Sequence, residues 1–74
     1  MEIAPGIVVD KNIRFGKPVI KGTRVPVELV LGKLAGGTSF EELMREYDLS
    51  RQDILAALSY ATQLVRSEEV RITG

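Results

Sequence analysis

Apolar residues recur at helical spacing in three consecutive stretches of the chain. In each stretch they fall close to i, i+3, i+4 and i+7, so that one face of a helix is apolar and the opposite face is polar. The three sets are Val27, Val30, Leu31 and Leu34; Phe40, Leu43, Met44 and Tyr47; and Ile54, Ala57, Leu58, Ala61, Leu64 and Val65. The pattern predicts three amphipathic helices that bury these faces against one another.

Residues that start and stop helices bound the first two stretches. Pro26 suits the first turn of a helix, where its missing N–H has no partner to lose, and Gly36-Gly37 ends that helix. Thr38 or Ser39 can cap the second helix, because a short hydroxyl side chain accepts from the free N–H groups of the first turn. We therefore expect two short helices separated by a glycine-rich turn.

The third helix follows a tight turn at Asp48-Leu49. Ser50 can cap it, and Asp53 three residues later gives a weak capping box. A short helix, a tight turn and a longer helix are the proportions of a helix-turn-helix, whose last helix enters the major groove of DNA. Any three-helix bundle with short loops has the same proportions, so the spacing alone leaves both interpretations open.

Two short β-prone runs precede the helices. Ile7-Val8-Val9 and Ile13-Arg14-Phe15 flank Asp10-Lys11-Asn12, whose Asp and Asn favour a tight turn, and together they predict a small hairpin. A two-stranded hairpin is barely stable alone. We expect it to pack on the helices, or to pair with another strand from tail residues 70–73 or from a second subunit. The predicted fold class is mainly α: a three-helix bundle with a helix-turn-helix, preceded by a short N-terminal β-hairpin.

The chain has 74 residues, which is the size of one small domain. We divide it into a hairpin and basic arm (1–24), the three-helix bundle (25–66) and a short tail (67–74). A domain of this size buries only about 60% of its unfolded surface. The chain also contains no cysteine or histidine to supply a disulfide or a thiolate or imidazole metal ligand. A homodimer is therefore expected.

The sequence predicts neither a membrane span nor an export signal. No run approaches the roughly 20 apolar residues that cross a bilayer. The first residues lack the basic start and the long apolar run of a signal peptide. We therefore expect a soluble, cytoplasmic protein with no membrane partner.

Positive charge is concentrated in one segment. The net charge is zero, yet residues 11–24 hold five of the ten Lys and Arg residues and no carboxylate. This basic arm (residues 11–24) is suited to contact a polyanion such as DNA. The candidate phosphate contacts are Arg14, Lys17, Lys21 and Arg24. The alternative is local pairing with the acidic helices, and Arg24 in particular could bond Glu28.

The outward face of the third helix carries side chains that can read DNA bases. Gln pairs with adenine edges, Arg pairs with guanine or phosphate, and small residues let a helix approach closely. The candidate contacts are Arg51, Gln52, Ser59, Gln63 and Arg66, with Ala56 as a small residue on the same face. The alternative is an ordinary solvated helix face. A further set is assigned to a dimer or partner interface: Ile7, Val9, Phe15 and Tyr60.

Catalytic chemistry has little support in the sequence. There is no His or Cys to act as base or nucleophile, and most carboxylates lie in the first turns of helices, where they compensate the helix dipole. Lys21-Gly22-Thr23 inverts the order of a phosphate-binding loop and lacks its flanking glycine. We therefore expect no enzyme activity, no metal site and no cofactor.

A long and unusual string begins at Gly16 and reads Gly-Lys-Pro-Val-Ile-Lys-Gly-Thr-Arg-Val-Pro-Val. It is followed by Leu-Ala-Gly-Gly-Thr-Ser at residues 34–39, a Phe-Glu-Glu-Leu helix start and Asp-Ile-Leu-Ala-Ala-Leu at residues 53–58. In these motifs, the stretch from about residue 7 to residue 61 closely resembles the family called domain of unknown function 433. The resemblance implies a homeodomain-like three-helix fold with a short β-element in front.

The resemblance also implies a function. Members of this family look like antitoxins of toxin–antitoxin pairs, often encoded beside a PIN-like ribonuclease. By analogy, the helix-turn-helix would bind the promoter of its own operon and another surface would neutralise the toxin. The tail at residues 67–74 is short for wrapping a toxin. The alternative is a protein-interaction module whose basic arm docks on the acidic active-site region of a nuclease without binding DNA.

Overall fold

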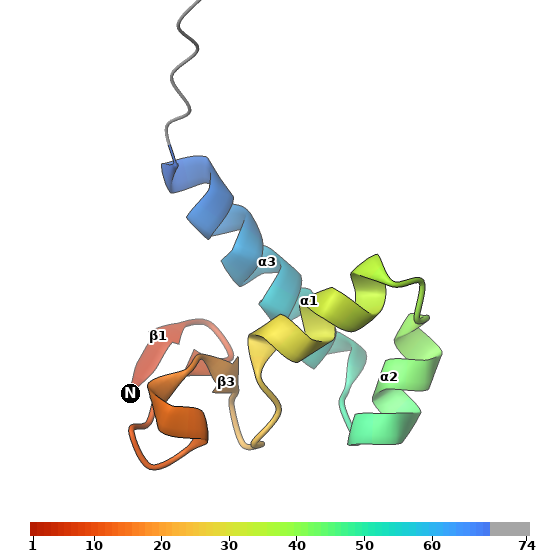
Figure 1. Ribbon diagram of the computed structural model, residues 1–74, viewed down its shortest axis with the longest axis horizontal. Coiled ribbons are helices and arrows are strands. Elements are labelled where there is room, and N and C mark those ends of the chain that lie inside the picture. Colours follow the sequence, from red (N-terminus) through yellow and green to blue (C-terminus); the bar gives the residue numbers. More distant parts are fainter. Residues whose placement is uncertain (69–74) are drawn as a thin grey trace, which may run out of the picture.

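A computed structural model describes residues 1–68 of the chain. Three short strands and a 3₁₀ turn come first, and three helices follow (Figure 1). The elements are β1 (Glu2–Ala4), β2 (Ile7–Val8), the 3₁₀ turn (Arg14–Gly16), β3 (Val19–Ile20), α1 (Val27–Ala35), α2 (Phe40–Tyr47) and α3 (Arg51–Ser67). The predicted fold class, mainly α with three helices behind a short β-hairpin, is confirmed.

The helix ends lie where the start and stop residues predict them. α1 begins after Pro26 and ends at Gly36, whose N–H donates to the carbonyl of Gly32. The Ser39 hydroxyl accepts from the backbone N–H of Glu42 at 3.1 Å, which caps α2. Of the two candidate caps for α2, Ser39 is therefore the one that is used.

α3 begins with the predicted capping box. Ser50 Oγ accepts from the Asp53 N–H at 3.1 Å, and the Asp53 carboxylate accepts from the Ser50 N–H at 2.9 Å. The preceding turn is tight because Asp48 adopts the left-handed conformation, with φ of 54°, which Asp tolerates better than most residues. Its N–H donates to the Met44 carbonyl, and Leu49 then enters the core. Local hydrogen bonds thus specify the whole helix–turn–helix unit.

The core is small and wholly aliphatic. Within the described residues, nine aliphatic side chains form the buried core, and they come from the sheet, from all three helices and from the turn before α3. They are Ile7, Val19, Ile20, Val27, Val30, Leu43, Leu49, Ile54 and Ala57. Among residues 1–68 no polar or charged side chain is buried. Apolar packing therefore supplies the buried contacts between the sheet and the helices.

The strands form an antiparallel sheet in the order β1-β2-β3. β2 is central, since Ile7 pairs with Ile20 of β3 while the other edge of β2 pairs with β1. The turn between β1 and β2 contains Gly6, with φ of 78°. An N-terminal hairpin is present as predicted, and its first predicted strand is β2, but β2 pairs with β1 before it and with β3 after it and not with residues 13–15.

The second predicted strand, residues 13–15, is wrong. The chain makes the expected tight turn, closed by one bridge between Asp10 and Ile13, but then enters the 3₁₀ turn. Arg14 and Phe15 have φ of 53° and 58°, values that an extended strand does not adopt. β3 takes the place in the sheet because both of its side chains are fully buried, a position unsuited to a charged Arg14.

The Lys-Gly-Thr-Arg part of the family-like string forms a second tight turn, which ties β3 to the start of α1. Gly22 has φ of 80°, and the Thr23 hydroxyl donates to the Ile20 carbonyl at 2.8 Å. The same hydroxyl accepts from the Val25 N–H at 3.0 Å. The string therefore has a structural use as a side-chain-supported turn.

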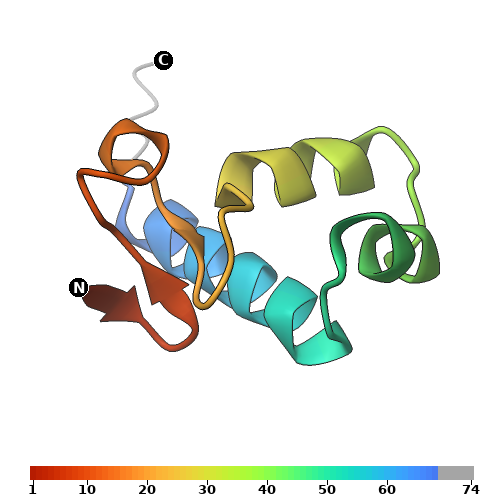
Figure 2. The ribbon, with the colours of Figure 1, turned by 90° about the horizontal axis from the view of Figure 1, so that it is seen from below.

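α3 runs along the molecule, with α2 near its start, α1 across it and the sheet on its other side (Figures 1 and 2). The turn between β1 and β2 approaches it closely, since a Cβ at Gly6 would lie 3.0 Å from the Cβ of Ala56. Ala56, which was predicted on the outward face, is partly buried and packs against the core. Its small size serves the contact with the sheet.

The last turns of α3 extend beyond the elements that it packs against (Figure 1). Ile54 and Ala57 are fully buried, whereas Leu64 is 49% and Val65 is 65% exposed. The predicted buried face is therefore wrong at its last two positions. α1 has nine residues and α3 has 17, so the longer helix outruns its neighbour. The candidate tail strand, residues 70–73, lies outside the described residues.

Candidate functional site

The predicted base-reading residues lie together along one side of α3. All five are exposed, and at about 100° per residue they fall within an arc of about 120°. They are Arg51, Gln52, Ser59, Gln63 and Arg66, and we call this set the α3 stripe. Leu55, which is 41% exposed, lies within the same arc. The stripe is one continuous, mainly polar surface with two cations.

Arg51 links the α3 stripe to α2. Its guanidinium lies 5.0 Å from the centroid of the Phe40 ring, a cation–π contact. Phe40 opens α2, whose first turn carries Glu41 and Glu42. The charge around this end of the stripe is therefore mixed, and a phosphate placed there would meet both signs of charge.

Lys17 of the basic arm forms an ion pair. Its Nζ donates to Oε1 of Glu28 in the first turn of α1 at 2.6 Å. The hydrogen bond from Lys17, and then its charge, hold the pKa of the Glu28 carboxyl below its usual value. The two side chains are 57% and 65% exposed, so water and salt screen the pair. The pair reduces the positive charge that Lys17 offers to a ligand.

Lys21 is paired as well. Its Nζ donates to Oε1 of Glu2 at 3.2 Å, while the other carboxylate oxygen of Glu2 accepts from the Gly6 N–H at 2.8 Å. The pKa of Glu2 is lowered, most by the backbone bond from Gly6 and then by Lys21. This pair ties the end of β3 to β1, so part of the basic arm is used within the fold.

Arg14 and Arg24 are exposed and make no ion pair with any residue from 1 to 68. Glu28, the alternative partner considered for Arg24, pairs with Lys17. Two of the four predicted phosphate contacts are therefore unpaired within residues 1–68, although the charge of Arg14 also helps to lower the pKa of Glu28.

Phe15 is presented to solvent by a strained turn. Arg14, Phe15 and Gly16 have φ of 53°, 58° and 81°, three consecutive residues in the left-handed region. The Gly16 N–H donates to the Ile13 carbonyl at 3.2 Å and closes the turn. The left-handed conformation costs about 1–2 kcal/mol for a residue with a side chain. Because Phe15 is 99% exposed, no packing within its own chain offsets that strain.

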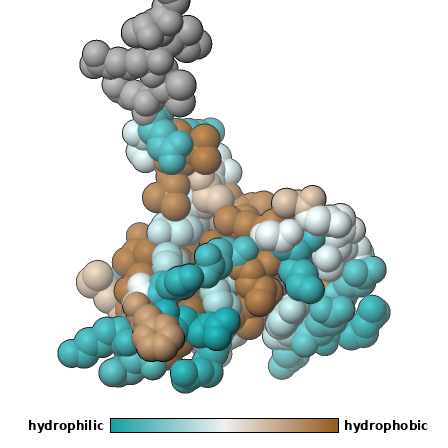
Figure 3. All heavy atoms as spheres, viewed as in Figure 1, coloured by the Kyte–Doolittle hydropathy of each residue, from teal (hydrophilic) through white to brown (hydrophobic). Residues whose placement is uncertain are grey.

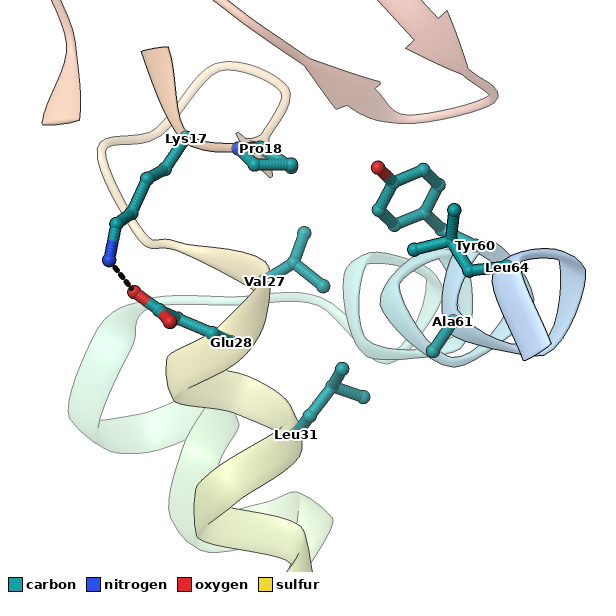
Figure 4. A pocket seen from close by; sticks show the side chains of 8 residues that line it. All are labelled: Lys17, Pro18, Val27, Glu28, Leu31, Tyr60, Ala61 and Leu64. Carbon is teal, nitrogen blue, oxygen red and sulfur yellow. Dashed lines mark hydrogen bonds and ion pairs between the residues drawn. The ribbon is translucent and has the colours of Figure 1, made fainter. Parts of the chain in front are cut away.

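An apolar groove lies where α1 and the projecting part of α3 diverge (Figure 4). Its volume is about 300 Å³, and the Lys17–Glu28 pair forms one edge. The apolar lining residues are Pro18, Val27, Leu31, Tyr60, Ala61 and Leu64. In the space-filling view, apolar atoms run from the projecting part of α3 towards α1, while polar atoms gather over α2 (Figure 3).

The groove and the α3 stripe occupy separate, neighbouring arcs of the same helix. At about 100° per residue, Tyr60 lies about 60° beyond Gln63, and Ala61 lies about 80° from Arg51. The structure therefore brings the five stripe residues together but places Lys17 at the groove. A ligand on the stripe and a ligand in the groove would contact separate surfaces.

The four predicted interface residues have different surroundings. Ile7 is 0% exposed and packs in the core of its own chain, which corrects its assignment to an interface. Val9 is half-buried, and its N–H donates to the Met1 carbonyl at 2.9 Å. Tyr60 is half-buried and lines the groove, and Phe15 is exposed beside it.

Two further classes of site are absent from residues 1–68. No three acidic side chains there lie close enough together to share a metal ion. Within the same residues, no helix combines the length and the apolar character needed to span a bilayer.

The string that forms β3, the tight turn and the start of α1 points to a family, and a comparison with family models decides it. The model described as "Protein of unknown function (DUF433)" matches residues 7–61. The chain belongs to the DUF433 family. The matched region contains β2, β3, α1, α2 and the packed part of α3, and it ends where the projecting turns begin.

A solved DUF433 protein has a similar fold. The crystal structure of a member from Anabaena variabilis matches this chain with a TM-score of 0.75 at 27% sequence identity. The match covers 82% of this chain and 61% of the other, so this DUF433 chain spans about three fifths of that protein's length. No functionally curated protein matches the chain.

The groove of this DUF433 protein is not predicted by the apolar pattern. The pattern assigns three of the lining residues to the core, since they repeat at core spacing: Val27, Leu31 and Leu64. A further lining residue, Pro18, lies within the basic arm. The signal that indicates the groove is helix length, because an apolar repeat that continues to Val65 outruns a first helix that ends at Gly36-Gly37. Apolar side chains on unmatched turns must face solvent or another molecule.

Proposed function

We propose that this chain is a DNA-binding antitoxin and transcriptional autoregulator of a toxin–antitoxin pair, which neutralises a PIN-like ribonuclease. The α3 stripe would read base edges in the major groove, and Arg14 and Arg24 would bind phosphates. The observation that carries the DNA-binding part is the continuous exposed stripe on the last helix of a helix-turn-helix unit.

The geometry around the stripe suits a helix that enters a groove. The left-handed Asp48 and the capping box of Ser50 and Asp53 fix the connection between α2 and α3. Gln52 and Gln63 can bond adenine edges, and Arg51 and Arg66 can bond guanine or phosphate.

The antitoxin part rests on the resemblance of this chain to antitoxin-type members of its family. A homeodomain-like bundle hosts several functions, so the transfer of this role to the chain is an analogy. The separation of the stripe from the groove supports it indirectly, because DNA and a protein could be bound on separate arcs of α3 at the same time.

A second candidate function is a protein-interaction module that binds a partner nuclease without binding DNA. The charge distribution favours it, because Lys17 and Lys21 are paired with carboxylates and the net charge is zero. Glu41 and Glu42 beside the stripe also favour this candidate, because their negative charges oppose the approach of DNA phosphates. In this case the unpaired cations of the basic arm would dock on the acidic active-site region of the nuclease.

Binding to duplex DNA tests the first candidate. The full chain is titrated into a labelled duplex from upstream of its own gene and into a scrambled duplex of the same composition, at several salt concentrations. We expect tighter binding to the upstream duplex, with a log–log salt slope of about −0.9 for each phosphate contacted. Equal affinity for the two duplexes at every salt concentration would contradict base reading.

A matched pair of double variants locates the contact. Arg51→Gln with Arg66→Gln removes two positive charges from the stripe, and Lys33→Gln with Arg45→Gln removes two from α1 and α2. The stripe variant should bind the upstream duplex at least about 10-fold more weakly, because each good base contact is worth about 1–3 kcal/mol. The other variant should bind almost as the wild type does. Equal losses would indicate a general effect of charge.

Co-expression with a PIN-like ribonuclease encoded beside the gene separates the two candidates. If the stripe variant loses DNA binding but still protects the cell, DNA and toxin use different surfaces. If Arg14→Gln with Arg24→Gln loses protection while DNA binding persists, the basic arm is a docking surface. Failure of the wild-type chain to protect would contradict the antitoxin role.

A further inference from the structure

Phe15 and the apolar groove lie side by side on one face of the molecule. Arg14, Phe15, Lys17 and Glu28 line a hollow, and the same Lys17 and Glu28 form an edge of the groove. The protruding aromatic ring and the apolar depression are therefore neighbours that share this ion pair. The face therefore carries both halves of a ring-in-groove contact.

The ring does not fill the groove of its own chain. Phe15 is 99% exposed, and the side chains that line the groove do not include it. The turn holds the ring in this position with φ of 53° at Arg14 and 58° at Phe15, a conformation that side-chain-bearing residues rarely adopt. Strain of this kind, when it gives no packing within the fold, is typical of binding positions.

We propose that two copies of the chain form a two-fold dimer in which Phe15 of each copy inserts into the groove of the other. A two-fold interface uses the same patch on both copies, so that patch must be complementary to itself. This face meets the requirement. The groove of about 300 Å³ can accept a phenyl ring, and Tyr60 lines it as an aromatic neighbour for that ring.

Charge and core size identify a second copy as the occupant. The net charge is zero, so two copies do not repel each other. The groove edge holds one ammonium and one carboxylate, Lys17 and Glu28, which can exchange partners across the axis, whereas a strongly charged peptide would need an edge of one sign. The core formed by residues 1–68 has only nine buried aliphatic side chains, and the dimer adds Phe15 and Leu64 to the buried apolar surface.

None of the five stripe residues lines the groove, so the ring-in-groove contact itself does not use the α3 stripe. The inference does not depend on the proposed function. Oligomeric state is measured with the chain alone, so a loss of DNA binding or of toxin neutralisation would leave this result unchanged.

Analytical ultracentrifugation of the full chain, from micromolar to millimolar concentration, tests the proposal. The wild-type chain should show a monomer–dimer equilibrium. Phe15→Asn should raise the dimer Kd at least about 30-fold, the loss expected for a hot-spot residue. Because Asn tolerates the left-handed conformation better than Phe does, the unfolding midpoint at low concentration should stay the same or rise. Unfolding therefore cannot explain the loss of the dimer.

Leu64→Gln and Leu55→Gln form a matched control pair. Both residues lie on α3 and are exposed to a similar extent, 49% and 41%, but only Leu64 lines the groove. Gln is a good helix former, so neither change should disturb α3. Leu64→Gln should raise the dimer Kd about 10-fold, and Leu55→Gln should leave it unchanged. Equal effects of the two changes would overturn the proposal.

Mixing the variants tests the reciprocal exchange. Phe15→Asn keeps the groove and lacks the ring, and Leu64→Gln keeps the ring and alters the groove, so a mixed pair retains one intact contact. The mixed pair should therefore associate more strongly than either variant chain does by itself. A mixed pair no stronger than the Leu64→Gln chain alone, a wild type that stays monomeric to millimolar concentration, or a Kd unmoved by Phe15→Asn would each overturn the proposal.

Discussion

The two halves of α3 carry the same apolar repeat and have different surroundings. In the packed half, residues 51–60, Ile54 and Ala57 are fully buried. In the projecting half, residues 61–67, Leu64 and Val65 are 49% and 65% exposed. Helical spacing thus predicts which side of the helix is apolar, whereas burial depends on how far α1 and the sheet extend. An apolar face beyond that limit is a surface that another molecule can cover.

The largest effect on stability should come from the packed half. Ile54→Ala leaves a cavity among fully buried side chains and should lower the free energy of unfolding by about 2–5 kcal/mol. Val65→Ala in the projecting half should change it by less than about 0.5 kcal/mol. Chemical denaturation at low protein concentration measures both. A loss above about 1 kcal/mol for Val65→Ala would mean that the projecting half is packed in the monomer.

The next largest effect should distinguish the two ends of α3. Ser50→Ala removes the side-chain acceptor of the capping box and should cost about 1 kcal/mol. Ser67→Ala removes only a bond from its hydroxyl to the Leu64 carbonyl on the projecting turns, and should stay within about 0.5 kcal/mol. The same denaturation experiment compares them. Equal costs would contradict the view that the start of α3 is the firmly held end.

A smaller effect, of opposite sign, is expected at the strained turn. Phe15→Gly should raise the free energy of unfolding of the monomer by about 0.5 kcal/mol, since relief of left-handed strain outweighs the added freedom of the unfolded chain. Asp48→Gly is the control, because Asp tolerates this conformation and its gain should be smaller. The Phe15 side chain, like those in the projecting half of α3, should thus contribute nothing to packing within the monomer. Destabilisation by Phe15→Gly would show that the ring does pack within its own chain.

The smallest effect concerns the exposed ion pairs away from α3. The pKa values of Glu28 and Glu2 are lowered from 4.5 in the folded chain. The stability they contribute is therefore present above pH 4.5 and is lost as the pH falls through the lowered folded pKa values. Lys17→Gln should raise the pKa of Glu28 towards 4.5 and leave that of Glu2 unchanged, as measured by carboxyl NMR titration. A parallel rise at Glu2 would indicate a general change of fold.

Much of the helical fold could be predicted because its signals are local. Ser39, Ser50 and Asp53 each act on backbone groups within three residues, so the sequence around them is sufficient to place the helix starts. The sheet could not be predicted in the same way. β2 pairs with β3 across the strained 3₁₀ turn, and that choice depends on which side chains fill the core.

The candidate site shows the same difference between local signals and contacts of separate elements. The α3 stripe follows from the helical repeat, so its five residues could be grouped from sequence. The Lys17–Glu28 and Lys21–Glu2 pairs depend on where separate elements meet, and the predicted free cations at Lys17 and Lys21 proved to be partnered. The left-handed φ of Phe15 has no sequence signal, because neither Arg14 nor Phe15 favours it.

The close contact between Gly6 and Ala56 limits how this sequence can evolve. A Cβ at Gly6 would lie 3.0 Å from the Cβ of Ala56, and the φ of 78° at Gly6 is one that other residues adopt at a cost. A larger side chain at position 56 would push the turn between β1 and β2 away from the helix. The exposed Arg45 and Glu46 of α2 have no such restriction. Lineages that keep this fold should therefore drift freely at positions 45 and 46 while holding a small residue at both 6 and 56.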